Sequence, residues 1–313
     1  MPLFRNPHLL LALTTFIWSG NAIAGKFAIG HVSPMMLTMS RWAVALVIIA
    51  LIARKHIADD WQVIRKNWLY LLLMGGIGYT GFNYCLYSGL QHISAINVTL
   101  EQSAMPLIIF ILNYAIYRTG ITWLQIVGFV LTFLGVIVIV SSGQPIALFS
   151  GEGPGINIGD IYMLGAAICY GGYSTALRSK PTMHWQSFLA CLVAGALIFG
   201  IVGAMVEYQA GHLQAPVTLQ GLSVVLYAGI FASLVAQGLF IKGVEAFGSN
   251  IAGIYINLVP VFGALLAVLL LGEQLYLFHA VAFVLVVGGI LIAQRKTESA
   301  AAAAAPPAAP DKS

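Results

Sequence analysis

Ten apolar stretches, each about as long as a bilayer is thick, follow one another along this chain of 313 residues. A helix rises ~1.5 Å per residue, so crossing ~30 Å of hydrocarbon takes ~20 apolar residues. The chain is therefore expected to form ten transmembrane helices, at residues 8–29, 35–54, 68–90, 93–117, 122–141, 159–179, 184–206, 219–241, 250–271 and 276–294.

The last five apolar stretches resemble the first five in sequence. Sliding the chain 154 places along itself brings Gly75 onto Gly229 and Gly135 onto Gly289. Five crossings per copy is an odd number, so the second copy must enter the membrane from the opposite side, as in many secondary transporters. The sequence predicts an all-α membrane protein with a first repeat at 1–150, an inverted repeat at 151–296 and a disordered tail rich in Ala and Pro at 297–313.

The composition excludes a soluble helical protein. Hydrophobic residues make up 60% of the chain, charged residues only 8%, and the mean hydropathy is +0.92. An ordinary soluble domain is ~25% charged and gives its helices one polar face. The predicted segments are apolar all round, so they require lipid as their solvent.

The distribution of positive charges among the loops predicts how the chain is oriented in the membrane. If the N-terminus is cytoplasmic, the outer loops hold Lys26 alone, and the other predicted loop cations lie inside. Positive loops are retained in the cytoplasm, so both termini are expected there, in an inner (plasma) membrane of bacterial type. The net charge of +4 therefore indicates a lipid bilayer, not nucleic acid, as the partner. The inner cations are Arg5, Arg54, Lys55, Arg65, Lys66, Arg118, Arg178, Lys180, Lys242, Arg295 and Lys296.

A family resemblance rests on two parts of the chain. Residues 255–267, which read YINLVPVFGALLA, and the LGE at 271–273 resemble the hallmark of the EamA family of the drug/metabolite transporter (DMT) superfamily. Residues 18–21 and 33–34, with Arg41, resemble the start of its first two helices. The resemblance covers residues 8–295. It implies ten helices in two inverted five-helix repeats around a central cavity, and metabolite efflux as the activity.

Two charged side chains lie within predicted spans. Arg41 and Glu101 are expected at similar depths, since both of their helices run from outside to inside. A charge in hydrocarbon costs ~2.5–3.5 kcal/mol on insertion scales, so each needs a partner or a task. Matching depth makes an ion pair possible. Such a pair either locks the two helices together or takes part in binding the substrate or coupling protons.

A second set of polar residues faces the predicted cavity. Asn83 and Tyr87 share one face of their helix, and the shift of 154 sets Asn83 on Gln237. An amide both donates and accepts hydrogen bonds, which suits a zwitterionic or neutral polar solute. The alternative is that each amide holds a neighbouring helix. Trp18 and Tyr170 are expected to supply aromatic walls to the same cavity.

The same shift sets Glu101 on Tyr255 and Pro106 on Pro260. Each proline removes a backbone hydrogen bond and interrupts its helix. Paired interruptions at corresponding positions point to a transport site, so Tyr255 and Asn257 are added to the substrate-binding candidates. Pro106 and Pro260 are the gating candidates, with helix packing as the alternative role.

Signatures of enzymes, metals and nucleotides are missing from the sequence. It has no Walker-type loop and no His-Glu-x-x-His pair, so no cofactor and no metal are expected. The function predicted is a secondary transporter that exports a small polar metabolite, such as an amino acid, by alternating access. An importer, a carrier for lipophilic cations or drugs, and an intramembrane lipid-modifying enzyme are the alternatives. Whether the chain forms a homodimer is left open.

The predicted orientation can be tested by thiol labelling of whole cells. In a background without Cys85, Cys169 and Cys191, an impermeant reagent should modify Glu152→Cys and leave Lys180→Cys protected, because only the first is expected outside. Opening the membranes should expose both positions. Labelling of position 180 alone in intact cells would reverse the assigned orientation.

Overall fold

The computed structural model describes residues 6–118, 121–150 and 155–304, and in these ranges it contains helices and no strand. All ten predicted apolar segments are helical. The elements are α1 Pro7–Ala28, α2 Pro34–Asp59, α3 Trp61–Lys66, α4 Trp68–Gly75, η2 Gly76–Gly81, α5 Phe82–Gly89, α6 Ala95–Gln102, α7 Met105–Tyr117, α8 Trp123–Val140, α9 Pro145–Ser150, α10 Ile158–Ala176, η3 Leu177–Ser179, α11 Trp185–Gln209, α12 Leu219–Leu226, η4 Tyr227–Val235, α13 Ala236–Ile256, α14 Val259–Leu266, η5 Ala267–Leu271 and α15 Leu277–Ala304.

Within the described residues, six helices are long and apolar enough to cross a membrane. They are Pro7–Ala28, Pro34–Asp59, Ala95–Tyr117, Trp123–Val140, Trp185–Gln209 and Leu219–Phe247, and shorter apolar helices cover Val259–Leu271 and Leu277–Ala293. The chain is thus a multi-pass membrane protein, whereas ten inverted spans remain a prediction. One expected loop is absent: α13 continues through residues 242–249, a stretch with no proline to end it.

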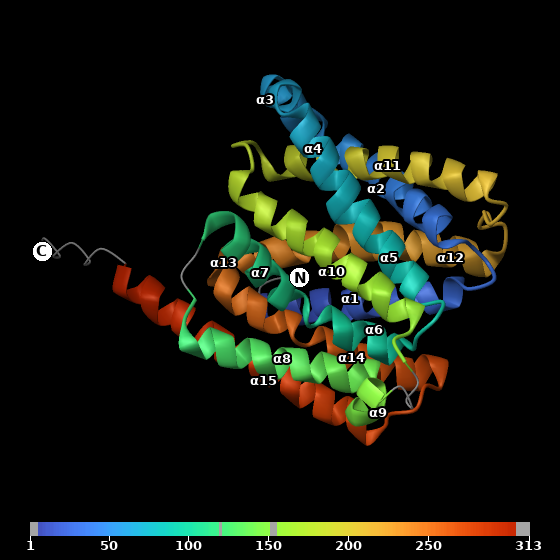
Figure 1. The fold of residues 1–313 in the computed structure, drawn as a ribbon. Coiled ribbons are helices and arrows are strands. Elements are labelled where there is room, and N and C mark those ends of the chain that lie inside the picture. Colours follow the sequence, from blue (N-terminus) through green and yellow to red (C-terminus); the bar gives the residue numbers. More distant parts are fainter. Residues whose placement is uncertain (1–5, 119–120, 151–154, 305–313) are drawn as a thin grey trace, which may run out of the picture.

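The two halves of the chain pack against each other along their whole length. Helix α2 packs on α11, α8 on α15, and α6 on α14, while α1 packs on α13 and α10 packs on α5. Figure 1 shows α8 and α15 side by side along one edge and α2 with α11 near the opposite edge, with α1 and α10 between them. Each of these pairs joins one half to the other, so neither half buries its polar faces alone.

Irregular backbone occurs at matching places in the two halves. The π-helix η2 covers residues 76–81, and residues 230–235, 154 places later, lie within the π-helix η4. Helices α6 and α7 are separated at residues 103–104, and α13 and α14 at residues 257–258, each break just before the predicted proline. Interruptions at equivalent points are what two copies of one unit would produce. The inversion of those copies stays a prediction.

Two glutamates of the second half bind helix N-termini of the first half. The Glu273 carboxylate accepts hydrogen bonds from the backbone N–H groups of Ala95, at 2.7 Å, and Ile96, at 3.0 Å. Glu207 similarly accepts from the N–H of Met36 at 3.2 Å, at the start of α2. A helix N-terminus carries partial positive charge and unpaired N–H groups, so a carboxylate there is stabilising.

One predicted boundary falls outside the described residues, and another, the start of the predicted tail at residue 297, falls inside α15. The division between the repeats was placed near residue 151, and residues 151–154 lie outside the described ranges. Helix α15 extends to Ala304, and residues 305–313 of the predicted tail also lie outside those ranges. The repeat boundary and the disordered tail stay predictions.

The contact between α8 and α15 generates a stability prediction. A Cβ added at Gly128 or Gly289 would fall on the carbonyl oxygen of the other glycine, whereas one added at Gly288 would meet nothing within 4 Å. Gly289→Leu should therefore force α8 and α15 apart and cost about 1–3 kcal/mol. Gly288→Leu is the matched control and should leave the thermal midpoint of the purified protein in detergent unchanged. Equal midpoints for both variants would show that the close contact is not formed.

Candidate functional site

The centre of the candidate site is the guanidinium of Arg41, on α2, whose side chain is only 4% exposed. Its Nη1 donates to the side-chain oxygens of Asn21, Asn83 and Tyr87, at 3.3 Å to Asn21 and 2.6 Å to Tyr87. Its Nε and Nη2 donate to the Ser233 hydroxyl at 3.1 and 2.7 Å. The guanidinium thus joins α1, α2 and α5 of the first half to η4 of the second half.

The partners of Arg41 are themselves held in place. The Asn83 amide donates to the carbonyl oxygen of Tyr79 at 2.7 Å, and the Tyr87 hydroxyl donates to Asn21 Oδ1 at 2.9 Å. The Ser233 hydroxyl donates to a backbone carbonyl five residues earlier, at 2.8 Å, within the π-helix. The oxygen atoms that face Arg41 are therefore oriented before any solute arrives.

Among the residues that the structure describes, the hydrogen-bond partners of Arg41 are all neutral. Its hydrogen-bond partners are two amides, a phenol and a hydroxyl, and its guanidinium also lies 4.8 Å from the ring centre of Trp42. Hydrogen bonds and an aromatic face lower the cost of burying a cation, but they do not cancel its charge. The site is therefore a buried region of positive potential.

Aromatic rings extend from Arg41 toward α10. The Trp42 ring stacks on that of Tyr79 with centroids 4.9 Å apart, and Tyr79 lies 5.4 Å from Tyr173. Tyr173 lies 5.8 Å from Tyr170, which lies 5.5 Å from Phe82. Tyr170, predicted as a cavity wall, belongs to this row. An apolar wall beside a fixed charge is the usual build of a site for a small amphipathic solute.

Glu101 is not among the hydrogen-bond partners of Arg41, so the ion pair that matching depth makes possible is not formed in this conformation. Helix α6 packs on α10 and α14, so the Glu101 carboxyl meets that of Asp160 within hydrogen-bonding range. A similar depth along the membrane does not fix which helices are neighbours. Glu101 Oε1 is buried and has no hydrogen-bond partner.

The other substrate-binding candidates are spread over the fold. Trp18 donates from its indole to the carbonyl oxygen of Ala232 at 3.3 Å, so it ties α1 to η4. Gln237 is half-buried on α13. The Tyr255 hydroxyl lies 2.6 Å from His8 Nδ1, at an exposed end of the molecule, and is not part of the Arg41 cluster. Asn83 and Tyr87 are therefore the candidates in contact with Arg41, and Tyr170 lies farther along the aromatic row.

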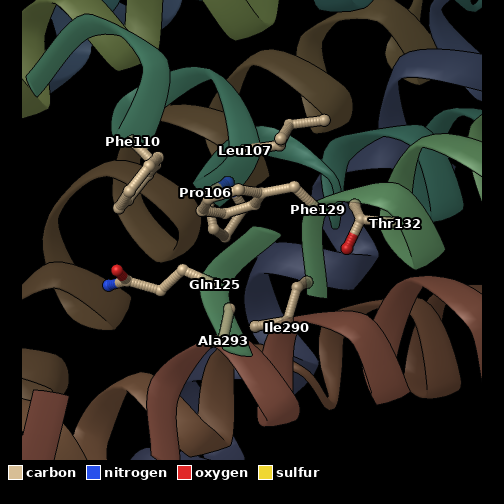
Figure 2. Close-up of a pocket in the computed structure, with 8 residues that line it drawn as sticks. All are labelled: Pro106, Leu107, Phe110, Gln125, Phe129, Thr132, Ile290 and Ala293. Carbon is tan, nitrogen blue, oxygen red and sulfur yellow. The ribbon is translucent and has the colours of Figure 1, made fainter. Parts of the chain in front are cut away.

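The helix breaks lie beside groups that are free to interact. Asn257 sits in the second break, and its side-chain nitrogen is buried without a hydrogen-bond partner. Pro106 borders a cavity of about 130 Å³ enclosed by α7, α8 and α15. Figure 2 shows Phe110 and Phe129 around this space, with Ile290 and Ala293 of α15 below. The cavity leaves room beside the interrupted helix.

Sequence reasoning missed three groups of the site. Asn21 is the last residue of the segment 18–21 that carried the family resemblance. That position was the signal that could have identified it as a site residue. Ser233 and Asp160 gave no signal of their own, because serines are common in membrane helices and Asp160 lies at a predicted helix start. Their importance comes from the helices they face.

Comparison with known proteins decides the family. The chain matches the EamA-like transporter family over residues 6–141 and again over residues 157–294. The chain belongs to the EamA-like transporter family. The resemblance carried by residues 255–267 is thereby confirmed.

The relatives of this EamA-family chain are named as transporters. A protein of Bacillus subtilis named "Uncharacterized transporter YyaM" is 25% identical over 291 residues, which cover 91% of this chain and 92% of that protein. A Chlamydia trachomatis protein named as an S-adenosylmethionine/S-adenosylhomocysteine transporter is 24% identical and covers 85% of this chain and 82% of its own length. Family and relatives are transporters by name, not enzymes.

One solved structure also shares the fold. A crystal structure of a protein that is 19% identical to this EamA-family chain superposes with a TM-score of 0.60, covering 93% of this chain and 98% of that one. At this identity the likeness concerns the fold alone. It shows that the helical arrangement described above is one found in a known protein.

The placement of Arg41 generates a prediction on coupling energies. Arg41→Gln and Ser233→Ala should be coupled by about 0.5–3 kcal/mol in unfolding experiments in mixed micelles, because the two side chains are in contact. Arg41→Gln and Glu101→Gln should be additive within about 0.5 kcal/mol, because they bond to different partners. Strong coupling of the second pair would restore the ion pair that the sequence predicted.

Proposed function

We propose that this protein is a secondary transporter that exports a small polar metabolite with a carboxylate, such as an amino acid, and that Arg41 binds that carboxylate. The observation that carries the proposal is the buried guanidinium with neutral partners only. A cation in hydrocarbon without a counter-ion is costly, and an anionic solute group would neutralise it. Arginine is suited to the task because its planar fork matches a carboxylate.

Neighbouring groups would complete the recognition of such a solute. Asn83 and Tyr87 accept hydrogen bonds from Arg41 in this structure and would bond to the solute when it is bound. Their amide and hydroxyl oxygens suit the amino group of a zwitterion. Trp42, Tyr79 and Tyr170 would pack against its side chain. The chlamydial relatives are named for S-adenosylmethionine and S-adenosylhomocysteine, and both solutes carry an amino-acid carboxylate.

Alternating access would use the two interrupted helices. Pro106 and Pro260 stand at equivalent breaks, one in each half, and Pro106 has open space beside it. Rocking one half against the other would open the cluster to one side as it closes the other. In this proposal Gln237, Tyr255 and Asn257 line the path toward the second opening, and Trp18 keeps α1 attached to the second half.

Two alternatives are less well supported by the site. A carrier of lipophilic cations would find aromatic walls here, but the uncompensated charge of Arg41 opposes a cationic solute. A lipid-modifying enzyme would need a nucleophile or a second acid beside Glu101, and Asp160 is such an acid, but the matched family and the relatives are transporters by name. Import of the same solute would use the same cluster, so the direction must come from the transport assay.

The function is tested by a counterflow assay in proteoliposomes with radiolabelled solutes. Each amino acid is compared with the corresponding amide, which lacks the carboxylate. Amino acids should exchange and amides should not, because only the first carry the carboxylate. Arg41→Gln should raise KM by roughly tenfold or more, since a hydrogen bond to a charged group contributes ~1.5–3 kcal/mol. Arg178→Gln removes the same charge at an exposed position and is the matched control.

Two outcomes would contradict the proposal. Equal exchange of amides and amino acids would show that no carboxylate is recognised. Exchange that Arg41→Gln leaves unchanged, with the folded protein recovered in normal yield, would show that another group binds the solute.

A further inference from the structure

Glu101 and Asp160 form a buried pair of acids that the solute site does not use. Glu101 lies on α6 of the first half and Asp160 on α10 of the second half, and each side chain is 8% exposed. Their carboxyl groups meet within hydrogen-bonding range, while Glu101 Oε1 has no partner. Two carboxylates this close and this buried cannot both be ionised, so the pair holds a proton.

The surroundings of the two carboxyls favour Glu101 as the member that holds the proton. Asp160 Oδ2 accepts the backbone N–H of Asn157 at 2.7 Å, and Asp160 belongs to the first turn of α10, where the helix N-terminus favours a negative charge. Glu101 stands at the end of α6 and has no such support. The neutral acid can donate to Asp160, so the pair is complete with one proton and one negative charge.

A polar cavity at the end of the molecule that carries residues 140–157 reaches Asp160, the outer member of the pair. It has a volume of about 230 Å³, and its walls include Asn97, Ser142, Asn157 and Asp160. That volume and that lining suit several water molecules. Asp160 is thus both a wall of the cavity and the partner of Glu101. In the predicted orientation this cavity opens to the outside.

The other titratable groups around α6 have their own contacts. His279 on α15 bonds to Asn97 at 3.1 Å, and Glu273 caps the start of α6, near Lys26 of α1. His92 stacks on Tyr162 at the cavity rim. Helices α8 and α14, which also pack on α6, contain no titratable residue. Asp160 is therefore the ionisable group in contact with Glu101 among the residues described.

The opposite end of the fold repeats this arrangement without acids. Shifting by 154 places sets Glu101 on Tyr255, and the slightly different offset of 152, which sets Trp18 on Tyr170, sets His8 on Asp160. The structure joins Tyr255 to His8 at 2.6 Å. Each pair connects the interrupted helix of one half to the first helix of the other half. The member on the interrupted helix, Glu101 or Tyr255, lies five residues before the proline of that helix, Pro106 or Pro260. Both pairs are formed at once here, and Arg41 between them is buried.

We propose that the Glu101–Asp160 pair is a proton-binding site that drives solute export by proton entry, an inference that rests on the proposed transport function. Glu101 takes up a proton from the outer cavity through Asp160. Rocking about the break at residues 103–104 separates α6 from α10, and the proton then leaves toward the cytoplasm. One proton enters for each solute that leaves, and no bond other than O–H is made or broken.

The test uses proteoliposomes loaded at acidic pH and diluted into alkaline buffer, with valinomycin and potassium holding the membrane potential at zero. A solute that exchanges in the counterflow assay should accumulate, up to about tenfold for one pH unit and one proton per solute. Glu101→Gln and Asp160→Asn should keep counterflow and lose accumulation, to about onefold. Glu245→Gln removes an exposed carboxyl and is the matched control.

The outcomes separate this proposal from the proposed function. Counterflow without gradient-driven accumulation in the wild type overturns the proton site alone. Accumulation driven by the opposite gradient overturns export coupled to proton entry. If no solute exchanges, the transport function fails, and infrared difference spectra still test the pair. The spectrum should show a protonated carboxyl that disappears in Glu101→Gln, and its absence in the folded wild type would show that the pair holds no proton.

Discussion

The arrangement of the helices around the middle of this protein depends on how one buried guanidinium is accommodated. Arg41 of α2 holds α1, α5 and η4 to its own helix because each of the three contributes at least one side-chain oxygen atom to it. In hydrocarbon such a group cannot be left without hydrogen bonds, so the four elements are held to one geometry. The same contacts leave the charge itself uncompensated, so in the proposed function the feature that fixes the helices also binds the carboxylate of the solute.

Irregular helices are the second condition for such a site. A regular helix satisfies its own backbone and offers little to a solute, whereas π-helical turns and broken helices expose polar groups where protein covers them. Ser233 lies within η4, and Glu101 ends α6 just before a break. One polar group of each proposed site thus lies where its helix departs from regularity.

Much of the fold could be predicted from the sequence, because lipid permits so few structures. The apolar stretches, the repeat and the proline positions each follow from length or periodicity, and the helices occur where they were expected. The site was predicted in part. Asn83, Tyr87 and Arg41 do meet, but Glu101 faces Asp160. The sequence indicates how deep a residue lies in the membrane and which face of its helix it occupies. Which side chain it contacts on another helix depends on packing between helices that are far apart in the chain.

The cavity beside Pro106 links the proposed rocking motion to a change in molecular volume. It occupies about 130 Å³ among apolar side chains of α7, α8 and α15. A half-helix that swings into such a space eliminates void, so the two ends of the transport cycle differ in partial molar volume as well as in access. Hydrostatic pressure favours the more compact state. Lateral tension and lipid packing also perform mechanical work on any change in the protein's cross-section, so bilayer composition becomes a physical variable of the proposed transport cycle.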